Sequence, residues 1–246
     1  MLCTHMAIVN KFTCIIPARY KSSRFPGKPL VDIEGKSMIS RVWHNANNAD
    51  MIERAIVATD DERIYDHCKS EECEVVYTSS DCNDGSARVA EVAEGIDTPY
   101  IFELQGDQPL VDSRTIDYFL NHAREDLIKN PAIDIVQPFA SATQGQVQSA
   151  DVVKVAVSRS NKMLLITREA IQSEYRTLGL YLWKKATLLN FQNMKVTDYE
   201  RAEKCHLLRF FLNDLYVQGV FMDGEDWVEV DREEDVLAVK KLIKKI

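Results

Sequence analysis

The sequence predicts an α/β fold: a mostly parallel, doubly wound sheet with a smaller mixed-sheet extension. Short apolar runs alternate with amphipathic helical segments over the first half of the chain, and the turns between them are short. Beyond about residue 130, strand-like runs follow one another with little helix between them. We see no internal repeat, low-complexity run or linker, so residues 1–246 are predicted to form a single domain.

The first half contains four strand-like runs, each followed by a helical segment. The strands are predicted at 12–18, 54–60, 73–78 and 99–112, where β-branched and aromatic residues gather. The helices are predicted at 36–49, 61–72, 86–96 and 113–127, where apolar residues recur at helical spacing. In a parallel sheet of this kind, ligands bind beyond the carboxyl ends of the strands. We therefore expect about 12–130 to carry a ligand site at the carboxyl ends of its strands.

The second half has a different pattern. Strand-like runs are predicted at 134–140, 152–158, 162–167 and 177–183, followed by helices at 198–215 and 232–246. We expect about 131–220 to form a mixed sheet extension. A returning strand and the last helix are expected within 221–246.

Composition excludes several classes of protein. The formal net charge is −8 and the pI is about 5.2, whereas a duplex-binding protein is usually basic, so no nucleic-acid partner is expected. No apolar stretch approaches the ~20 residues that span a bilayer, and the N-terminus lacks the pattern of a signal peptide. A cytoplasmic location without membrane association is the expectation. The six cysteines form no CxxC pair, and the spacing of Cys68, Cys73 and Cys82 fits no zinc template.

The run "IIPARYKSSRFPGKPL" at 15–30 places four cations within ten residues, directly after a buried strand. These are Arg19, Lys21, Arg24 and Lys28. Three prolines stiffen the loop, and Gly27 permits close approach of the backbone. A solvated loop whose cations balance nearby acids is the plainer alternative, but a stiff cationic loop at a strand end favours polyphosphate binding. The run matches neither the P-loop nor the dinucleotide-binding glycine pattern.

Two aspartates are candidate ligands of Mg²⁺, which prefers carboxylate and phosphate oxygens. Asp107 ends the fourth strand in "LQGDQP", at the same sheet edge as the basic loop. A turn-forming role is its alternative. Asp231, in "VDREEDV", precedes a helix and has Glu234 three residues later, which is also the pattern of a capping box. Capping and metal binding are hard to combine in one orientation of Asp231.

Several segments together resemble the CMP-Kdo synthetase (3-deoxy-manno-octulosonate cytidylyltransferase) family. They are "IIPARYKSSRFPGKPL", "IVATDDERI", "DGSARVAEV", "LQGDQPLVD", "VVKVAV", "LGLY" and "VEVDREEDV", in the family's order and over most of the chain. The resemblance implies a nucleotide-diphospho-sugar transferase-like fold, with about 12–130 as the CTP-binding half and about 131–220 as the sugar-binding and dimerisation part. It also implies a homodimeric, Mg²⁺-dependent nucleotidyltransferase that couples CTP to a 2-keto-3-deoxy sugar acid and releases pyrophosphate. It is expected to serve lipopolysaccharide biosynthesis.

The resemblance also implies roles for individual residues. Arg19, Lys28, Asp107 and Asp231 are expected to be catalytic, with Asp107 and Asp231 as the metal ligands. The expected CTP-binding residues are Pro17, Ala18, Arg19, Ser22, Arg24, Lys28, Asp60, Ser86, Arg88 and Gln105. The expected sugar-binding residues are Arg168, Thr177, Tyr181, Glu203 and Lys204. A guanidinium such as that of Arg168 suits the substrate carboxylate.

Departures from the family pattern gather in the sugar half. Thr177 stands where the family has histidine, Lys204 where it has glutamine, and the segment 169–177 is shorter. Asp84 also replaces a serine of the nucleotide segment. Two alternatives therefore stay open: a CMP-activating enzyme for another acidic sugar, such as a nonulosonic acid, and a catalytically weak homologue that binds nucleotide or sugar. Retention of the four expected catalytic residues favours an enzyme.

Overall fold

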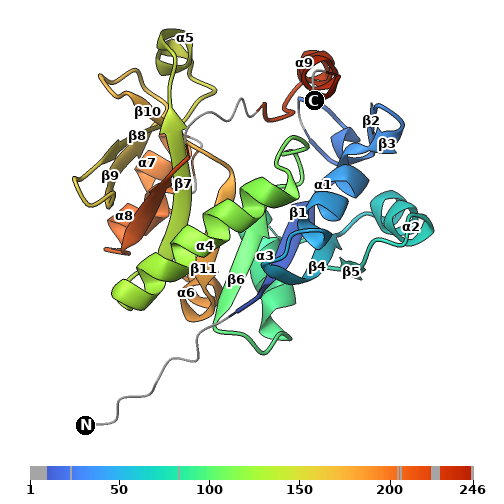
Figure 1. Ribbon diagram of the computed structural model, residues 1–246, viewed down its shortest axis with the longest axis horizontal. Helices are drawn as coiled ribbons and strands as arrows, with labels where there is room; N and C mark the ends of the chain where they lie inside the picture. The colour runs from blue at the N-terminus through green and yellow to red at the C-terminus, as the bar shows by residue number, and fades with distance from the viewer. Residues whose placement is uncertain are drawn as a thin grey trace.

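The computed structural model describes residues 10–22, 24–82, 84–203, 205, 207–222 and 228–244. In these residues one ten-stranded sheet runs through the molecule, with helices on both of its faces (Figure 1). The strand order is β5-β4-β1-β6-β11-β7-β10-β8-β9, and β12 pairs with β7 beside this path. The predicted α/β class, with a parallel first half and a mixed extension, is confirmed.

The parallel half is built around β1 (Phe12–Ala18), which lies between β4 (Ile52–Thr59) and β6 (Tyr100–Leu104). The short β5 (Val75–Tyr77) pairs with β4 at the outer edge, also in parallel. All seven residues of β1 and all five of β6 are buried, as expected for strands covered on both faces. The carboxyl ends of β1, β4 and β6 therefore share one edge of the sheet.

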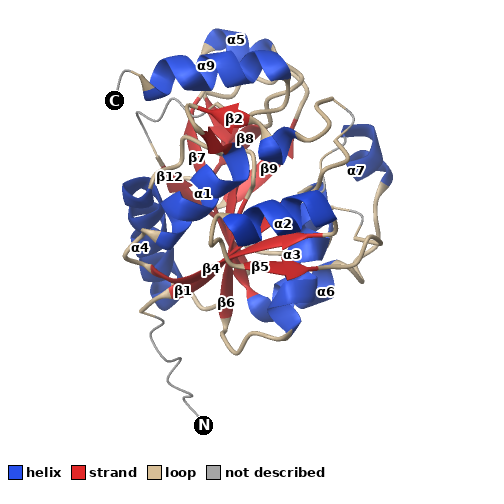
Figure 2. Cartoon of the chain, turned by 90° about the vertical axis from the view of Figure 1, so that its right-hand side faces the viewer, coloured by secondary structure: helices blue, strands red, loops and turns tan. Residues whose placement is uncertain are grey.

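Helices cover both faces because side chains alternate along each strand. Cys14 and Ile16 face a cluster that includes α1 (Met38–Asn47), α2 (Glu62–Ser70) and α4 (Ser113–Lys129). Ile15 faces the opposite cluster, with α3 (Gly85–Glu94) and α6 (Lys185–Phe191) (Figure 2). The longest described helix, α4, has 17 residues, and none of the described helices is long and apolar enough to cross a bilayer.

The mixed half begins where β11 (Leu180–Lys184) pairs antiparallel with β6. β11 and β10 (Tyr175–Thr177) pair along β7 (Ile135–Ser141), and β12 (Val217–Phe221) pairs with β7 in parallel. β8 (Lys154–Val157) and β9 (Met163–Thr167) complete the sheet. The smaller helices are α5 (Gln144–Gln148), α7 (Asp198–Glu203) and α8 (Leu208–Leu212).

Several boundaries differ from the sequence prediction. The predicted strand at 177–183 is interrupted at 178–179. Both parts pair with β7, but β10 also pairs with β8, whereas β11 also pairs with β6. The predicted helix at 198–215 is two short helices, and α6 was not predicted at all. The returning strand expected within 221–246 is β12, which ends at Phe221, and the described residues 228–230 belong to no strand.

The last helix, α9 (Glu233–Ile243), packs near the basic loop. Val236 and Val239 are buried against Ile33 and Met38, together with Val230. Ile33 belongs to the two-stranded hairpin of β2 (Asp32–Ile33) and β3 (Lys36–Ser37), which follows the short 3₁₀ helix η1 (Lys28–Leu30). This small core brings the segment before α9 to the carboxyl ends of the parallel strands.

We predict that Gly219→Ala destabilises the protein, because β12 has no room for a side chain there. A Cβ at Gly219 would lie 2.7 Å from Cε1 of Phe139 and 2.8 Å from the backbone oxygen of Asn161. Overpacking of this kind costs about 1–3 kcal/mol of unfolding free energy. Gly145→Ala is the matched control, since nothing lies within 4 Å of its Cβ position. Equal midpoints of urea unfolding for the two variants would contradict the prediction.

Candidate active site

The basic loop begins where β1 ends at Ala18 and turns back through Gly27 into η1. Gly27 has a φ of 75°, a conformation that residues with a side chain rarely adopt. The backbone N–H groups of Ser22 and Gly27 both donate to the carbonyl oxygen of Tyr20, at 3.0 and 2.9 Å. The loop is therefore a defined turn, and it directs Lys28 toward the end of β6.

Lys28 connects the two candidate metal ligands. Its ammonium group donates to Oδ2 of Asp107 at 2.8 Å, to the carbonyl oxygen of Val230 at 3.0 Å and to Oδ1 of Asp231 at 3.4 Å. Burial lowers the pKa of Lys28, but attraction to Asp107 and Asp231 outweighs it, so that the pKa lies above its ordinary value. Oxygens of both carboxylates therefore surround one cation.

Asp231 does not cap α9. The carboxylate that accepts the backbone N–H groups of Asp231 and Arg232, at 2.9 and 2.7 Å, belongs to Asp235. The capping alternative for Asp231 is thus wrong, because the helix starts one residue later than that pattern requires. The Asp231 carboxylate faces the basic loop instead, where Oδ2 lies 2.9 Å from Nη2 of Arg24.

Most of the residues expected to bind CTP line one cavity of about 260 Å³ at this sheet edge. They are Pro17, Ala18, Arg19, Ser22, Arg24, Lys28, Arg88 and Gln105, together with Asp107 and Asp231. Two of the expected residues lie behind the lining. Asp60 is 3.2 Å from Nη2 of Arg88, and Ser86 is fully buried with its hydroxyl donating to Glu103 at 3.0 Å.

Arg88 and Asp84 both come from the start of α3. Arg88 is 3% exposed, and its guanidinium is held by Asp60, the hydroxyl of Thr78 and the carbonyl oxygen of Ser79. Asp84 is the N-cap of α3 and accepts from the N–H of Ala87 at 2.8 Å. This capping role accounts for an acidic residue beside a cationic loop.

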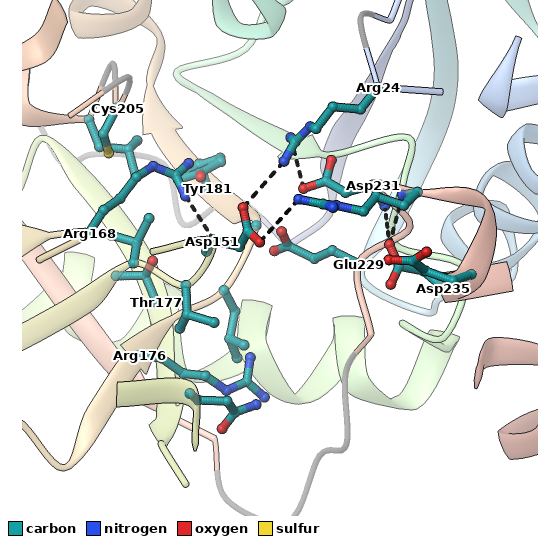
Figure 3. A pocket seen from close by; sticks show the side chains of 18 residues that line it. Arg24, Asp151, Arg168, Arg176, Thr177, Tyr181, Cys205, Glu229, Asp231 and Asp235 are labelled. Atoms are coloured by element: carbon teal, nitrogen blue, oxygen red, sulfur yellow. Dashed lines mark hydrogen bonds and ion pairs between the residues drawn. The ribbon is translucent and has the colours of Figure 1, made fainter. Parts of the chain in front are cut away.

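A second cavity, of about 470 Å³, opens on the mixed half of the sheet (Figure 3). Arg168, Thr177 and Tyr181 line it, as does Arg176, which the sequence prediction missed. Arg24 and Asp231 line both cavities. The residues expected to bind nucleotide and those expected to bind sugar therefore meet at a shared boundary.

Arg168 is oriented by its neighbours. Its Nη1 donates to the carbonyl oxygens of Asp151 at 2.8 Å and Ala150 at 3.2 Å. Glu203 accepts from the backbone N–H of Arg168 and from the hydroxyl of Thr167, both at 2.6 Å. Glu203 thus stabilises the end of β9 through these hydrogen bonds. It does not line the larger cavity. Lys204 lies outside the described residues.

Asp151 joins the two halves across the cavity boundary. Its carboxylate lies 3.6 Å from Nη1 of Arg24 and 3.6 Å from Nη2 of Arg232. Figure 3 shows the contacts of Arg24 with Asp151 and with Asp231. All three side chains in the two ion pairs are about half exposed, so each pair adds little to stability.

Glu103, in the middle of β6, is a second residue that the sequence prediction missed. Its carboxyl group is fully buried, and burial raises its pKa to about 8. It accepts from the indole N–H of Trp183 at 2.8 Å, and also from Ser86 and the side-chain amide of Gln105. The signal in the sequence was a lone acid within the apolar run "YIFEL".

Comparisons with known proteins agree on one family. A family model described as cytidylyltransferase matches residues 13–220. The 3-deoxy-manno-octulosonate cytidylyltransferase of Syntrophotalea carbinolica is 36% identical over 246 residues, covering 93% of this chain and 96% of that protein. The enzyme of the same description from Trichlorobacter lovleyi is 34% identical over 259 residues, covering 95% and 99%.

Solved structures give the same result. A structure of CMP:2-keto-3-deoxy-manno-octonic acid synthetase complexed with CTP is similar with a TM-score of 0.87 and 26% identity, covering 96% of this chain and 99% of that one. HddC from Yersinia pseudotuberculosis has a TM-score of 0.71 at 14% identity, covering 94% and 99%. At that identity the likeness concerns the fold alone.

We predict that Asp235→Ala destabilises the protein and that Asp231→Asn does not. Asp235 accepts two backbone N–H groups at the start of α9, and loss of such a cap costs about 1 kcal/mol of unfolding free energy. Asp231 makes no such contact, and asparagine preserves its shape. Thermal unfolding of both variants checks this. An Asp231→Asn midpoint as low as that of Asp235→Ala would return Asp231 to the capping role.

Proposed function

This chain belongs to the cytidylyltransferase family, and we propose that it couples CTP to 3-deoxy-manno-octulosonate, giving the CMP-sugar and pyrophosphate. One observation carries the proposal: the cavity lined by the expected nucleotide residues and the cavity lined by Arg168 and Tyr181 share Arg24 and Asp231. A group transfer between two bound substrates requires such a boundary, because the reacting atoms have to come within about 3–3.5 Å.

The nucleotide is proposed to lie in the smaller cavity. The base would sit by Pro17, Ala18 and Gln105, and the triphosphate would run along the basic loop. Arg19 is exposed at the rim, and Arg24 stands at the boundary, where the α-phosphate would meet the sugar. Arginine and lysine there offset the charge of the triphosphate and stabilise charge that develops in the transition state.

Asp107 and Asp231 are proposed to hold a magnesium ion. Their fit to a cation is supported by Lys28, whose ammonium group is reached by oxygens of both carboxylates at 2.8 and 3.4 Å. Among the described residues no group of three or more His, Cys, Asp or Glu side chains could hold a metal, which agrees with a site completed by phosphate oxygens. When bound, the ion would polarise phosphate oxygens and offset their charge.

The proposed reaction is an in-line displacement. The anomeric hydroxyl oxygen of the sugar forms a bond to the α-phosphorus of CTP, the bond from that phosphorus to the pyrophosphate oxygen breaks, and the hydroxyl proton is lost. The chain contributes position and charge: Arg24 at the boundary, Lys28 beside both aspartates, and Arg168 and Arg176 in the sugar cavity for the substrate carboxylate. The expected homodimer and cytoplasmic location stay predictions.

A pyrophosphate-release assay with CTP, Mg²⁺ and a panel of acidic sugars tests the proposal. We expect turnover with 3-deoxy-manno-octulosonate and little with nonulosonic acids or neutral aldoses. Turnover with a nonulosonic acid alone would assign that substrate instead. Tight CTP binding without turnover on any sugar would identify a binding homologue.

We predict that Asp107→Asn and Asp231→Asn each fold normally and lose about tenfold or more of kcat. Asparagine is a neutral and poorer ligand for Mg²⁺ than a carboxylate. The loss should be partly recovered at high Mg²⁺ concentration. Asp198→Asn is the matched control, because this exposed carboxylate pairs with Arg201 and lines neither cavity. Full kcat in Asp231→Asn would leave Asp107 as the sole supported ligand.

We predict that Arg168→Ala raises the KM for the sugar about tenfold and leaves the Kd for CTP nearly unchanged. Arg168 lines the sugar cavity and does not line the nucleotide cavity. Steady-state kinetics and calorimetry with CTP separate the two effects. Arg114→Ala, at an exposed site on α4, is the control. Acceptance of a neutral aldose as readily as the acid by wild-type protein would refute a carboxylate role for Arg168.

A further inference from the structure

Glu103 is a buried carboxyl group that neither the fold nor the proposed reaction requires. It lies in the fully buried strand β6, beside Ile15 of β1 and Tyr181 of β11, where an apolar side chain would pack without cost. Burying a carboxyl group is unfavourable unless hydrogen bonds compensate. The carboxyl group at this position therefore calls for an explanation in terms of its partners.

Three donors surround Glu103. The indole N–H of Trp183 donates to Oε2 at 2.8 Å, and the hydroxyl of Ser86 donates to Oε1 at 3.0 Å. The third donor is Nε2 of Gln105, which also binds Oε1. An ionised carboxylate can only accept hydrogen bonds, so it selects the nitrogen end of the Gln105 amide.

The orientation of the Gln105 amide decides whether the nucleotide cavity presents a hydrogen-bond donor or an acceptor to its ligand at this position. Gln105 lines that cavity, and its amide lies against Gly85 and close to Pro17, since a Cβ on Gly85 would meet Oε1 of Gln105 at 3.4 Å and Cγ of Pro17 at 3.3 Å. With one N–H of Nε2 held by Glu103, Oε1 is the hydrogen-bond acceptor that the amide offers a ligand. A base beside Pro17 then meets an acceptor at Gln105.

We propose that Glu103 is a positioning residue that makes this site prefer cytosine to uracil, by fixing which end of the Gln105 amide faces the base. Cytosine carries an amino donor at N4, whereas uracil carries an acceptor oxygen at the same position. An acceptor at Gln105 binds the amino group of cytosine and repels the oxygen of uracil. The inference rests on the proposed function, because it requires a pyrimidine nucleotide in this cavity.

The test compares CTP with UTP at about pH 8.5, where the Glu103 carboxyl, with its pKa of about 8, is mostly ionised in the wild-type protein. Glu103→Gln offers Gln105 an N–H₂ group, so the Gln105 amide can turn and present its nitrogen to the base. We expect the ratio of kcat/KM for CTP to that for UTP to fall about tenfold. Gln105→Leu should lower the ratio too, and adding Glu103→Gln to it should change the ratio no further.

Gly219→Ala is the control for a merely structural role. It destabilises β12 and changes no donor to Glu103. It should lower thermal stability and keep the CTP to UTP ratio.

An unchanged ratio in Glu103→Gln would overturn the inference, as would an equal loss in Gly219→Ala. Retained preference for CTP in Gln105→Leu would overturn it however Glu103→Gln folds. Absence of turnover with CTP in the wild-type protein would instead reject the proposed function.

Discussion

The contact of Lys28 with Asp107 and Asp231 is the interaction on which the site depends. It joins three segments that are distant in sequence: the basic loop after β1, the end of β6 and the approach to α9. Without the ammonium group, two partly buried carboxylates at this separation would repel each other. The contact is supported by the backbone, since the N–H of Val230 donates to the carbonyl oxygen of Asp107 at 3.0 Å. The small core under α9 fixes the last of the three segments.

The halves of the site differ in how firmly they are built. In the nucleotide half, Arg88 is buried and held by Asp60, Thr78 and Ser79, so its place is set before any ligand arrives. In the sugar half, the described hydrogen bonds of the Arg168 side chain are to the backbone carbonyl oxygens of residues 150 and 151. Thr177 is only partly buried. Preorganised donors suit a triphosphate, whose geometry is constant. The departures at Thr177 and in the shortened segment 169–177 fall where the framework is less constrained.

The sequence predicted the layers of the fold because apolar periodicity reports which face of an element is buried. It also predicted that Lys28 and Asp107 lie near each other, since the carboxyl ends of parallel strands meet at one edge. It did not settle Asp231, because the start of α9 shifts by one residue and passes the capping role to Asp235. Glu103 and Arg176 were missed because their partners come from other strands and helices, and periodicity carries no information about partners. The break between β10 and β11 was missed for the same reason: the run 177–183 has leucine at every second position, as in one continuous strand, while its pairing depends on β7.

The position of Asp231 near the end of the chain has a consequence during synthesis on the ribosome. The N-terminal segments emerge first, and β1, β4, β5 and β6 are consecutive neighbours in the parallel sheet that can assemble while translation continues. At that stage Lys28 has Asp107 as a partner but lacks Asp231. Strand β7 still lacks its partner β12. The complete set of charges exists only after the segment around Asp231 has been released. A nascent chain can therefore form its sheet before its reaction centre, and a chain that stops before Asp231 contains every described strand but lacks one of the two carboxylates around Lys28.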